Sequence, residues 1–252
     1  MMLHSVKLSF IIVEYHSIDD ILICQDSILE NLSLKIPYEL IVSSNSIYSQ
    51  SKQKELVEAY NDLKWVFNEK NGGFAYAMNQ GLKVANGDVL IIMNPDVRMR
   101  SNLELMLRYL ISADSIGVIA PKIRNAQGEI QDSFRNFITP DRFLLRHIGR
   151  FTSPNKKVGG EENPKEVDWV IGAFMMMTRK SYELTKGFDE GYFLYCEDMD
   201  FCKRVYQKGY SVVYYPSVEI EYQGTRSARH SLKYAIIFFK SLLRYWMKFG
   251  VF

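Results

Sequence analysis

Residues 68–97 read NEKNGGFAYAMNQGLKVANGDVLIIMNPDV, and this stretch decides the class of fold. Gly72 and Gly73 precede Phe74–Val84, whose apolar residues follow helical spacing. Asp88–Met93 is then a short apolar run typical of a buried strand, and it leads directly into the polar residues 94–96. A helix followed by a buried strand with polar residues at its end predicts one unit of an open α/β sheet.

The same alternation of strands and helices continues on both sides of this stretch. The expected strands are Leu8–Val13, Glu39–Val42, Lys64–Phe67 and Gly117–Ala120, and the expected helices are Asp19–Leu32, Lys52–Tyr60 and Leu103–Ser112. This order predicts a Rossmann-like α/β fold with a mostly parallel central sheet flanked by helices. Ligands bind such sheets beyond the carboxyl ends of the strands, so polar residues there are candidate ligand contacts. They are Glu14, Ser44, Asn45, Asn71, Gly73, Asn94 and Asp96.

The second half of the chain has a weaker pattern. Residues 121–166 are polar and irregular, and a long irregular loop is usually functional or mobile. Beyond it the sequence predicts one strand over Val167–Thr178, a helical turn over Ser181–Thr185, a helix over Glu197–Gln207 and a strand over Ser211–Tyr215.

Composition and missing motifs exclude several classes of protein. The 252 residues carry a net charge of +2, which does not favour binding to a polyanion by overall charge. The three cysteines form no CxxC pair and favour a reducing cytoplasm. No signal peptide and no run of roughly 20 apolar residues is found. A GxGxxG motif after the first strand, a P-loop, HExxH and GxSxG are also absent.

Two turns next to the predicted sheet have a functional and an ordinary interpretation. Asp96 follows a buried strand and is able to hold a divalent metal that binds a diphosphate, but Asn, Pro and Asp also form ordinary turns. Gly72 and Gly73 permit an anion to approach the backbone amides at a helix start. Taken alone, an ordinary helix-entry turn explains the glycines better.

Three carboxylates lie in the aromatic segment FLYCEDMDFCKRV, residues 193–205. Glu197 and Asp198 begin the predicted helix, where the helix dipole stabilises a negative charge and keeps a carboxylate able to accept a proton. The ordinary alternative is the preference of acids for helix N-termini. Asp200 fits an i,i+4 ion pair with Arg204. The flat rings of Tyr192, Phe193 and Tyr195 favour a sugar site, although such rings also fill cores.

Four segments, in their order and spacing, resemble family 2 glycosyltransferases with the GT-A fold. The similarity extends from Ser9 to Gln223 and is closest to the bacterial rhamnosyltransferase-like branch. The segments are SFIIVEYHS (9–17), the stretch 68–97, VIGAFMMMTRKSYELTKGFDE (170–190) and FLYCEDMDFCKRVYQKGY (193–210). The resemblance implies inverting transfer of a sugar from a nucleoside diphosphate sugar to a glycan or lipid-linked acceptor, in the biosynthesis of a cell-surface polysaccharide.

The resemblance also implies roles for particular residues. Asp198 is expected to be the general base, with Glu197 beside it, and Asp96 is expected to bind Mg²⁺ or Mn²⁺. The donor site is expected to contain Glu14, Ser44, Asn45, Asn71, Gly73, Asn79, Asn94 and Asp96, and the acceptor site Trp169, Gly172 and Tyr195. Residues 1–225 are expected to form the catalytic domain, with the nucleotide-sugar half at 1–120 and the acceptor half at 121–225.

Three positions depart from the family pattern. Glu14-Tyr15-His16 stands where the family has an Asn-Tyr-Asn-like loop, and Ser44 stands where it has an Asp that reads a pyrimidine base. Glu221 is the nearest match to a late metal-binding His, and its oxygens also suit a metal. These changes affect the nucleotide-binding and metal-binding positions. The branch resemblance leans toward dTDP-rhamnose as donor.

Residues 226–252 are expected to form a basic amphipathic helix. Lys233, Lys240, Arg244 and Lys248 share one face of the segment Tyr234–Phe249, and most other positions are aliphatic or aromatic. This pattern fits a helix lying in a membrane interface, which predicts a cytoplasmic protein peripheral to the inner face of the cell membrane. The alternative is a helix packed on the catalytic domain or in a homodimer.

Other functions remain open. A nucleotidyltransferase shares the sheet and the metal acid but needs a glycine-rich basic loop after its first strand, which is absent. A non-catalytic nucleotide-sugar or glycan-binding protein of the same fold is the alternative outside enzymes. A glycoside hydrolase also needs paired acids, but it does not explain residues 94–96 or the glycines. No nucleic-acid partner is expected.

Overall fold

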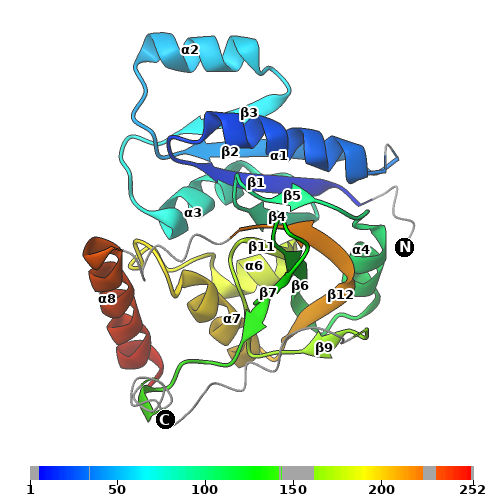
Figure 1. The fold of residues 1–252 in the computed structure, drawn as a ribbon, viewed down its shortest axis with the longest axis vertical. Coiled ribbons are helices and arrows are strands. Elements are labelled where there is room, and N and C mark those ends of the chain that lie inside the picture. The colour runs from blue at the N-terminus through cyan, green and yellow to red at the C-terminus, as the bar shows by residue number, and fades with distance from the viewer. Residues whose placement is uncertain (1–5, 34, 142, 144–161, 224–230, 251–252) are drawn as a thin grey trace.

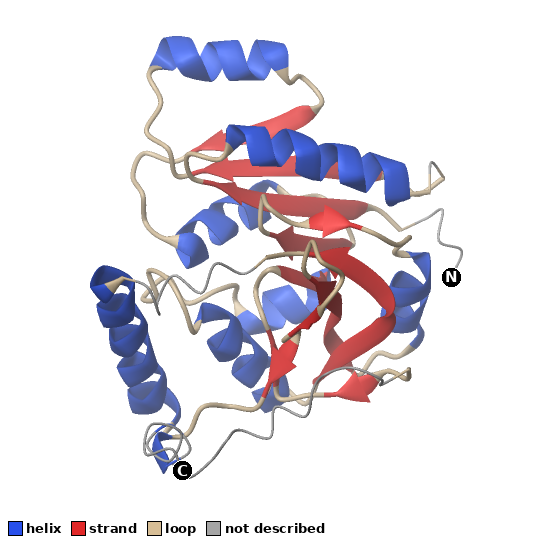
Figure 2. Cartoon of the chain, viewed as in Figure 1, coloured by secondary structure: helices blue, strands red, loops and turns tan. Residues whose placement is uncertain are grey.

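The computed structural model describes residues 6–33, 35–141, 143, 162–223 and 231–250. The strands are β1 (Leu8–Glu14), β2 (Tyr38–Ser44), β3 (Leu63–Phe67), β4 (Val89–Met93), β5 (Arg98–Met99), β6 (Ile116–Arg124), β7 (Ile130–Gln131), β8 (Phe134–Arg135), β9 (Lys165–Glu166), β10 (Trp169–Val170), β11 (Phe174–Thr178) and β12 (Ser211–Glu221). The helices are α1 (Ile18–Asn31), α2 (Gln50–Ala59), α3 (Phe74–Val84), α4 (Glu104–Ser112), α6 (Arg179–Thr185), α7 (Glu197–Gln207) and α8 (Leu232–Phe249). The arrangement is an α/β fold (Figures 1 and 2).

The main sheet has the strand order β3-β2-β1-β4-β11-β6-β12-β5. Strands β1 to β4 run parallel to one another, and β6 and β12 also pair in parallel. β11 is antiparallel to both of its neighbours, so β6 and β12 point in the same direction as β1. Among the longer described strands only β11 runs against the others, which confirms the predicted mostly parallel sheet.

The two faces of the sheet bury separate cores because side chains alternate along each strand. Phe10 and Ile12 of β1 point to the face covered by α1 and α4. Ile11 and Val13 point to the opposite face, which is covered by α3 and α7. A strand buried on both sides must be apolar at nearly every position, and this is the pattern from which the sheet was predicted.

Two parts of the second half differ from the sequence prediction. The single strand expected over Val167–Thr178 is wrong, because residues 171–173 separate β10 from β11. β10 pairs with β8 in a separate two-stranded sheet, whereas β11 joins the main sheet. The segment 121–166, expected to be irregular, contains the end of β6 and the short strands β7, β8 and β9, and its residues 142 and 144–161 lie outside the described residues.

The expected domain limits lie at residues 120 and 225. The division at residue 120 falls inside β6, so the two predicted halves share one sheet. The boundary at 225–226 lies outside the described residues.

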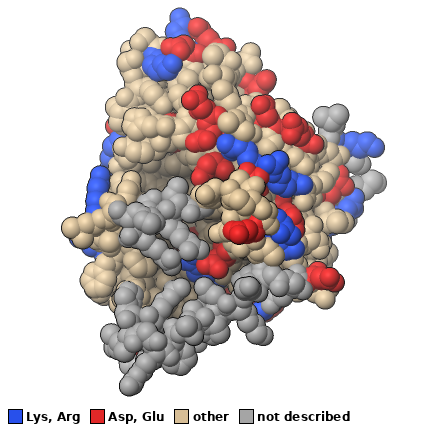
Figure 3. Space-filling model, in the orientation of Figure 1, with Lys and Arg blue, Asp and Glu red and all other residues tan. Residues whose placement is uncertain are grey.

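No helix among the described residues is long and apolar enough to cross a membrane. Basic and acidic side chains intermingle on the face drawn in Figure 3, in keeping with the net charge of +2.

Candidate active site

Glu14 ends β1 in a fully buried position and is surrounded by hydrogen-bond donors. Its carboxylate accepts hydrogen bonds from Ser44 Oγ at 2.5 Å, Ser46 Oγ at 3.0 Å and Tyr48 Oη at 3.1 Å. It also accepts one from the backbone amide of Ser17 at 3.0 Å. Glu14 and Ser44, two of the three departures from the family pattern, therefore contact each other and join the loops that follow β1 and β2. Direct contact of Glu14 or Ser44 with a nucleotide stays a prediction.

Asn45, Asn71 and Gly73 come together at the same edge of the sheet. Asn45 Nδ2 donates to the carbonyl of Gly73 at 3.0 Å, and Asn45 Oδ1 accepts from Asn68 Nδ2 at 3.0 Å. Asn71 Oδ1 accepts from the amide of Gly73 at 3.1 Å. These side chains shape the turn that precedes α3, as expected for residues at the ends of neighbouring parallel strands.

Gly73 joins this turn to the loop before α7. Its φ of 90° favours glycine, and a Cβ at this position would lie 2.1 Å from the carbonyl oxygen of Phe193. That same oxygen accepts a hydrogen bond from the amide of Phe74 at 2.8 Å. The glycine is therefore required for close backbone packing between the start of α3 and the segment that carries the acids.

Asn79 of α3 makes a second connection to the same region. Its Nδ2 donates to the carbonyl of Phe188 and to Glu190 Oε1, both at 2.9 Å, and its Oδ1 accepts from the amide of Phe188 at 2.9 Å. Asn79 is buried, and its amide is used within the protein. Its predicted contact with a donor is untested, and its observed contacts position the loop between α6 and α7.

Asp96 follows β4 as predicted and is half-buried. The neighbouring Arg98 is directed elsewhere, because it donates to the carbonyl of Pro95 at 2.8 Å and to Asp20 at 3.4 Å. Burial and the negative charge of Asp20 raise the pKa of Asp96, whereas Arg98 opposes this shift. A half-buried carboxylate that forms no ion pair among the described residues fits a divalent cation, whose charge would favour its ionised form.

Glu221 fits a metal less well. Its carboxylate accepts hydrogen bonds from Arg100 at 3.0 Å and 2.5 Å in an ion pair. The described residues contain no cluster of three or more His, Cys, Asp or Glu side chains able to hold a metal. The structure thus supports Asp96 as the stronger candidate ligand, and the metal role of Glu221 stays a prediction.

Tyr222 follows β12 and contacts the end of β4, and sequence reasoning missed it. Its hydroxyl accepts a hydrogen bond from Asn94 Nδ2 at 3.1 Å. Burial raises the pKa of Tyr222 to about 12, and the negative charges of Asp96 and Asp198 add to the shift. The hydrogen bond places Tyr222 beside Asn94, which is two residues before Asp96 in the chain.

Asp198 and Glu197 begin α7 and are both buried. Asp198 accepts hydrogen bonds from the backbone amides of Gly172 and Met199, each at 2.8 Å. Burial raises the pKa of Asp198, while these amides and Arg135 oppose the shift. Oε2 of Glu197 is buried without a hydrogen-bond partner in the described part of the chain, and burial together with the charge of Asp198 raises the pKa of Glu197 well above the usual range. The arrangement favours an ionised Asp198 beside a protonated Glu197.

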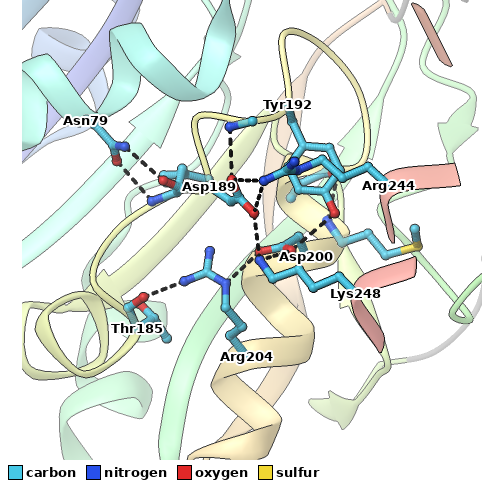
Figure 4. A network of polar contacts seen from close by, with 12 residues as sticks. Asn79, Thr185, Asp189, Tyr192, Asp200, Arg204, Arg244 and Lys248 are labelled. Atoms are coloured by element: carbon cyan, nitrogen blue, oxygen red, sulfur yellow. Dashed lines mark hydrogen bonds and ion pairs between the residues drawn. The ribbon is translucent and has the colours of Figure 1, made fainter. Parts of the chain in front are cut away.

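The environment of Asp200, the third acid of this segment, indicates a structural role. It is fully buried and accepts hydrogen bonds from Arg204 Nε at 2.5 Å, Tyr192 Oη at 3.2 Å and Lys248 Nζ at 2.6 Å (Figure 4). The predicted pair with Arg204 is confirmed. The partner from helix α8 was not expected, because 48 residues separate Lys248 from Asp200.

The residues predicted to bind an acceptor lie around the acids. The backbone amide of Gly172 contacts Asp198, as described above. Trp169 is buried, donates from Nε1 to the carbonyl of Asn136 at 3.0 Å and is covered by Arg135, whose guanidinium carbon lies 5.8 Å from the ring. Tyr195 packs edge-on against Phe238 at a ring distance of 5.9 Å. Contact of these residues with an acceptor is untested.

A family model described as glycosyl transferase family 2 matches residues 9–184, which is well over half of the chain. The chain belongs to glycosyl transferase family 2. A second model, described as the N-terminal domain of galactosyltransferase, matches residues 162–231. The two matches together include the ends of β1 and β4 and the acids of α7, so the family similarity extends over the candidate site.

Curated relatives of this family 2 chain include three with similar identity. The low-salt glycan biosynthesis hexosyltransferase Agl10 of Haloferax volcanii is 27% identical over 81% of this chain and 63% of its own length. Rhamnosyltransferase WbbL of Escherichia coli is 26% identical over 82% of this chain and 80% of its own. An N-acetylglucosaminyl-diphospho-decaprenol L-rhamnosyltransferase of Mycobacterium tuberculosis is 24% identical over 78% and 70%, respectively. These names support the rhamnosyltransferase-like branch of family 2.

Solved structures confirm the GT-A fold. GalNAc-T7, crystallised with UDP, GalNAc and Mn²⁺, superimposes with a TM-score of 0.70 at 16% identity, over 96% of this chain and 48% of its own. The mannosyltransferase PcManGT of Pyrobaculum calidifontis, in complex with GDP-Man and Mn²⁺, gives a TM-score of 0.60 at 18% identity, over 94% and 64%. This chain thus spans less than two thirds of the length of both neighbours.

Proposed function

We propose that this family 2 chain transfers a sugar, with inversion, from a nucleoside diphosphate sugar to a hydroxyl group of a glycan or lipid-linked acceptor. The observation that carries the proposal is a pair of hydrogen bonds at residues 172–173: the carbonyl of Ala173 accepts from the amide of Asn94 at 3.0 Å, and the amide of Gly172 donates to Asp198 at 2.8 Å. The segment that carries Asp96, which forms no ion pair among the described residues, therefore meets the segment that binds Asp198 beyond the end of β4. Inverting transfer requires these two groups, one for the leaving diphosphate and one for the attacking hydroxyl.

Asp198 acts as the general base in this proposal. The acceptor oxygen forms a bond to the anomeric carbon, its proton moves to Asp198, and the bond from that carbon to the diphosphate breaks on the opposite face. The amides of Gly172 and Met199 keep the carboxylate oriented and favour its ionised form. Protonated Glu197 does not compete for the acceptor proton and limits the negative charge at the site.

Asp96 is the residue that would hold the divalent metal, Mg²⁺ or Mn²⁺. A bound metal would neutralise negative charge on the departing diphosphate. Asn94 contributes indirectly, because its amide orients Tyr222 next to Asp96. The Mn²⁺ present in the structures of GalNAc-T7 and PcManGT supports the kind of cofactor.

The donor of this chain is dTDP-rhamnose in our proposal, and the acceptor is a lipid-linked glycan. The relatives from Escherichia coli and Mycobacterium tuberculosis are both rhamnosyltransferases, which supports rhamnose as the sugar, and the diphospho-decaprenol acceptor of the second supports a lipid-linked acceptor. Purified protein incubated with UDP-, GDP- and dTDP-sugars, each with Mg²⁺ or Mn²⁺, tests the choice of donor. We expect a metal-dependent rise in melting temperature with the dTDP-sugar, since a ligand that binds only the folded state stabilises it. A rise with another nucleotide alone would contradict the donor assignment.

Helix α8 also supports a peripheral membrane location. Its outer side exposes an apolar stripe flanked by the exposed Lys233 and Lys240. The stripe comprises Leu232, Ile236, Phe239, Leu243 and Met247. Arg244 and Lys248, the other two basic residues expected at lipid, pair with acids of the domain instead. Such a stripe with flanking cations suits a membrane interface that contains anionic lipid.

Sedimentation with phosphatidylglycerol-containing vesicles tests the membrane contact. We expect the wild-type chain to sediment with these vesicles and the Leu243→Glu/Met247→Glu double variant to stay in the supernatant, because buried charge weakens interfacial insertion. Equal sedimentation of both proteins, or none with either, would contradict a lipid-facing α8. A thermal melt of the variant is the control. We expect the wild-type melting temperature, because both substituted positions are exposed and the core is unchanged.

A further inference from the structure

Helix α8 packs on the loop that connects α6 to α7. Leu242 and Tyr245 are buried in the core that also contains residues of α7. Ser241 Oγ donates a hydrogen bond to the carbonyl of Leu194 at 2.8 Å. Trp246 Nε1 donates to the carbonyl of Ile138 at 2.7 Å. The inner side of the helix is thus part of the catalytic domain, whatever covers its outer side.

Two basic side chains of α8 reach Asp189 near the start of this loop (Figure 4). Arg244 contacts both carboxylate oxygens of Asp189, at 2.8 Å and 3.0 Å, and Lys248 contacts one of them at 2.8 Å. Burial by itself would raise the pKa of Asp189, but the hydrogen bonds from Lys248, Gly191 and Arg244 lower it to about 2. Asp189 is therefore ionised at neutral pH and binds α8 through charge-assisted hydrogen bonds.

Lys248 connects this loop directly to α7. Its ammonium group lies 2.8 Å from Asp189 and 2.6 Å from Asp200, so a single side chain bridges the two ends of the segment that contains the acid pair. Asp200 is fully buried, and its other partners are Arg204 and Tyr192. A buried carboxylate that loses one of its cations becomes partly uncompensated, and its surroundings must rearrange.

The bridged segment contains strained backbone. Tyr195 and Cys196 adopt left-handed conformations with φ of 69° and 67°, and Glu197 and Asp198 follow immediately. Residues other than glycine keep such conformations only where the surrounding structure imposes them. The segment is bound to α3, because the carbonyl of Phe193 accepts from the amide of Phe74 and Glu190 accepts from Asn79. Helix α8 adds contacts through Ser241, Arg244 and Lys248.

We infer that Lys248 is a positioning residue for the acid pair: by bridging Asp189 and Asp200 it holds residues 189–200 in the strained conformation that presents Asp198 to the acceptor. The inference rests on the proposed function. It assigns to the helix outside the predicted catalytic domain a part in sugar transfer, and it predicts a loss of turnover from a side chain that touches no substrate.

Hydrogen–deuterium exchange of the full chain tests the positioning without any turnover. We compare the wild type with Lys248→Met, which keeps the aliphatic stem, and with Lys54→Met, which changes an exposed lysine of α2 outside the proposed sites. Peptides that cover 189–200 are expected to exchange at least about tenfold faster in Lys248→Met only, because the local opening of a less tightly bound segment is easier. Unchanged exchange in these peptides would overturn the inference.

Steady-state kinetics then test the connection to the acids. We expect Lys248→Met to lower kcat about 10- to 100-fold, as misplacement of a catalytic group does, with little change in the KM for the donor. Lys248→Arg should recover most of the loss, since a guanidinium restores both ion pairs, and Lys54→Met should behave as wild type. Faster exchange with an unchanged kcat would show a purely structural bridge and would overturn the inference. A wild-type chain that turns over no donor would refute the proposed function, and exchange alone would then decide whether Lys248 holds the segment.

Discussion

Replacement of Asp198 by asparagine is expected to lower kcat for sugar transfer by about 10²- to 10⁴-fold, the usual contribution of a general base. The amide accepts no proton from the acceptor hydroxyl. It matches the carboxylate in size but has one accepting oxygen, so it keeps one of the two hydrogen bonds from Gly172 and Met199. Donor binding depends on other residues, so the metal-dependent rise in melting temperature with the donor should remain. Initial rates with saturating donor, together with thermal melts, measure both effects.

Glu197→Gln is the matched control for this substitution. Burial and the neighbouring Asp198 raise the pKa of Glu197 well above the usual range, so glutamine resembles the protonated form that this environment favours. We expect Glu197→Gln to cost less than about tenfold in kcat, far less than Asp198→Asn. The opposite order, with Asp198→Asn active and Glu197→Gln inactive, would assign the base to Glu197 and contradict our assignment.

The same base predicts a pH dependence. Asp198 must be ionised to accept the acceptor proton, and burial raises its pKa above the ordinary 3.8. The rate should therefore fall as the pH decreases through this raised pKa, at a higher pH than for an exposed aspartate. A pH profile of kcat/KM for the wild type, with no such acid limb in the residual activity of Asp198→Asn, checks the assignment.

Replacement of Asp96 by asparagine is expected to abolish the metal-dependent stabilisation by donor and to lower kcat/KM by about 10³-fold. The estimate reflects the several kcal/mol by which a metal stabilises a departing diphosphate. In the absence of metal, Asp96→Asn should not destabilise the protein, because burial and Asp20 disfavour the ionised Asp96 and a neutral amide relieves this cost. The metal-free variant should thus melt at or above the wild-type temperature, as is common where function opposes stability.

Glu221→Gln serves as the comparison for Asp96. Its carboxylate is engaged by Arg100, so this variant should lose an ion pair but keep the metal-dependent response to donor. Titration of each protein with Mn²⁺ at fixed donor concentration separates the two cases. Equal loss of the response in both variants would make Glu221 a metal ligand, and an unaltered response in Asp96→Asn would remove Asp96 from the metal site.

Local signals in the sequence predicted several elements with the observed limits. Helices α3 and α7 begin and end where expected, because Gly73 and the acids at 197–198 are N-terminal signals that act within a few residues. The Asp200–Arg204 pair was predicted for the same reason, since neighbours four residues apart on a helix meet in any context. The doubly buried strands followed from their continuous apolar composition.

The parts that sequence reasoning missed depend on partners far along the chain. The run 167–178 is apolar except at Asp168 and Thr178, yet it breaks at Gly172, whose amide binds Asp198 26 residues away. Tyr222 gained a role only through its hydrogen bond with Asn94, 128 residues away. No spacing rule connects such positions, so they could not be identified before the fold brought them together.

Helix α8 illustrates the difference between what local sequence signals predict and what long-range contacts decide. Its amphipathic pattern is a local property, and the sequence by itself predicted a helix with basic and apolar sides within residues 226–252, where the structure has α8 at 232–249. Only the tertiary structure decided that Arg244 and Lys248 face Asp189 and Asp200. Periodicity specifies which side chains share a face, because it follows from helix geometry. What that face contacts depends on the positions of elements about 50 residues away, which only the packed chain determines.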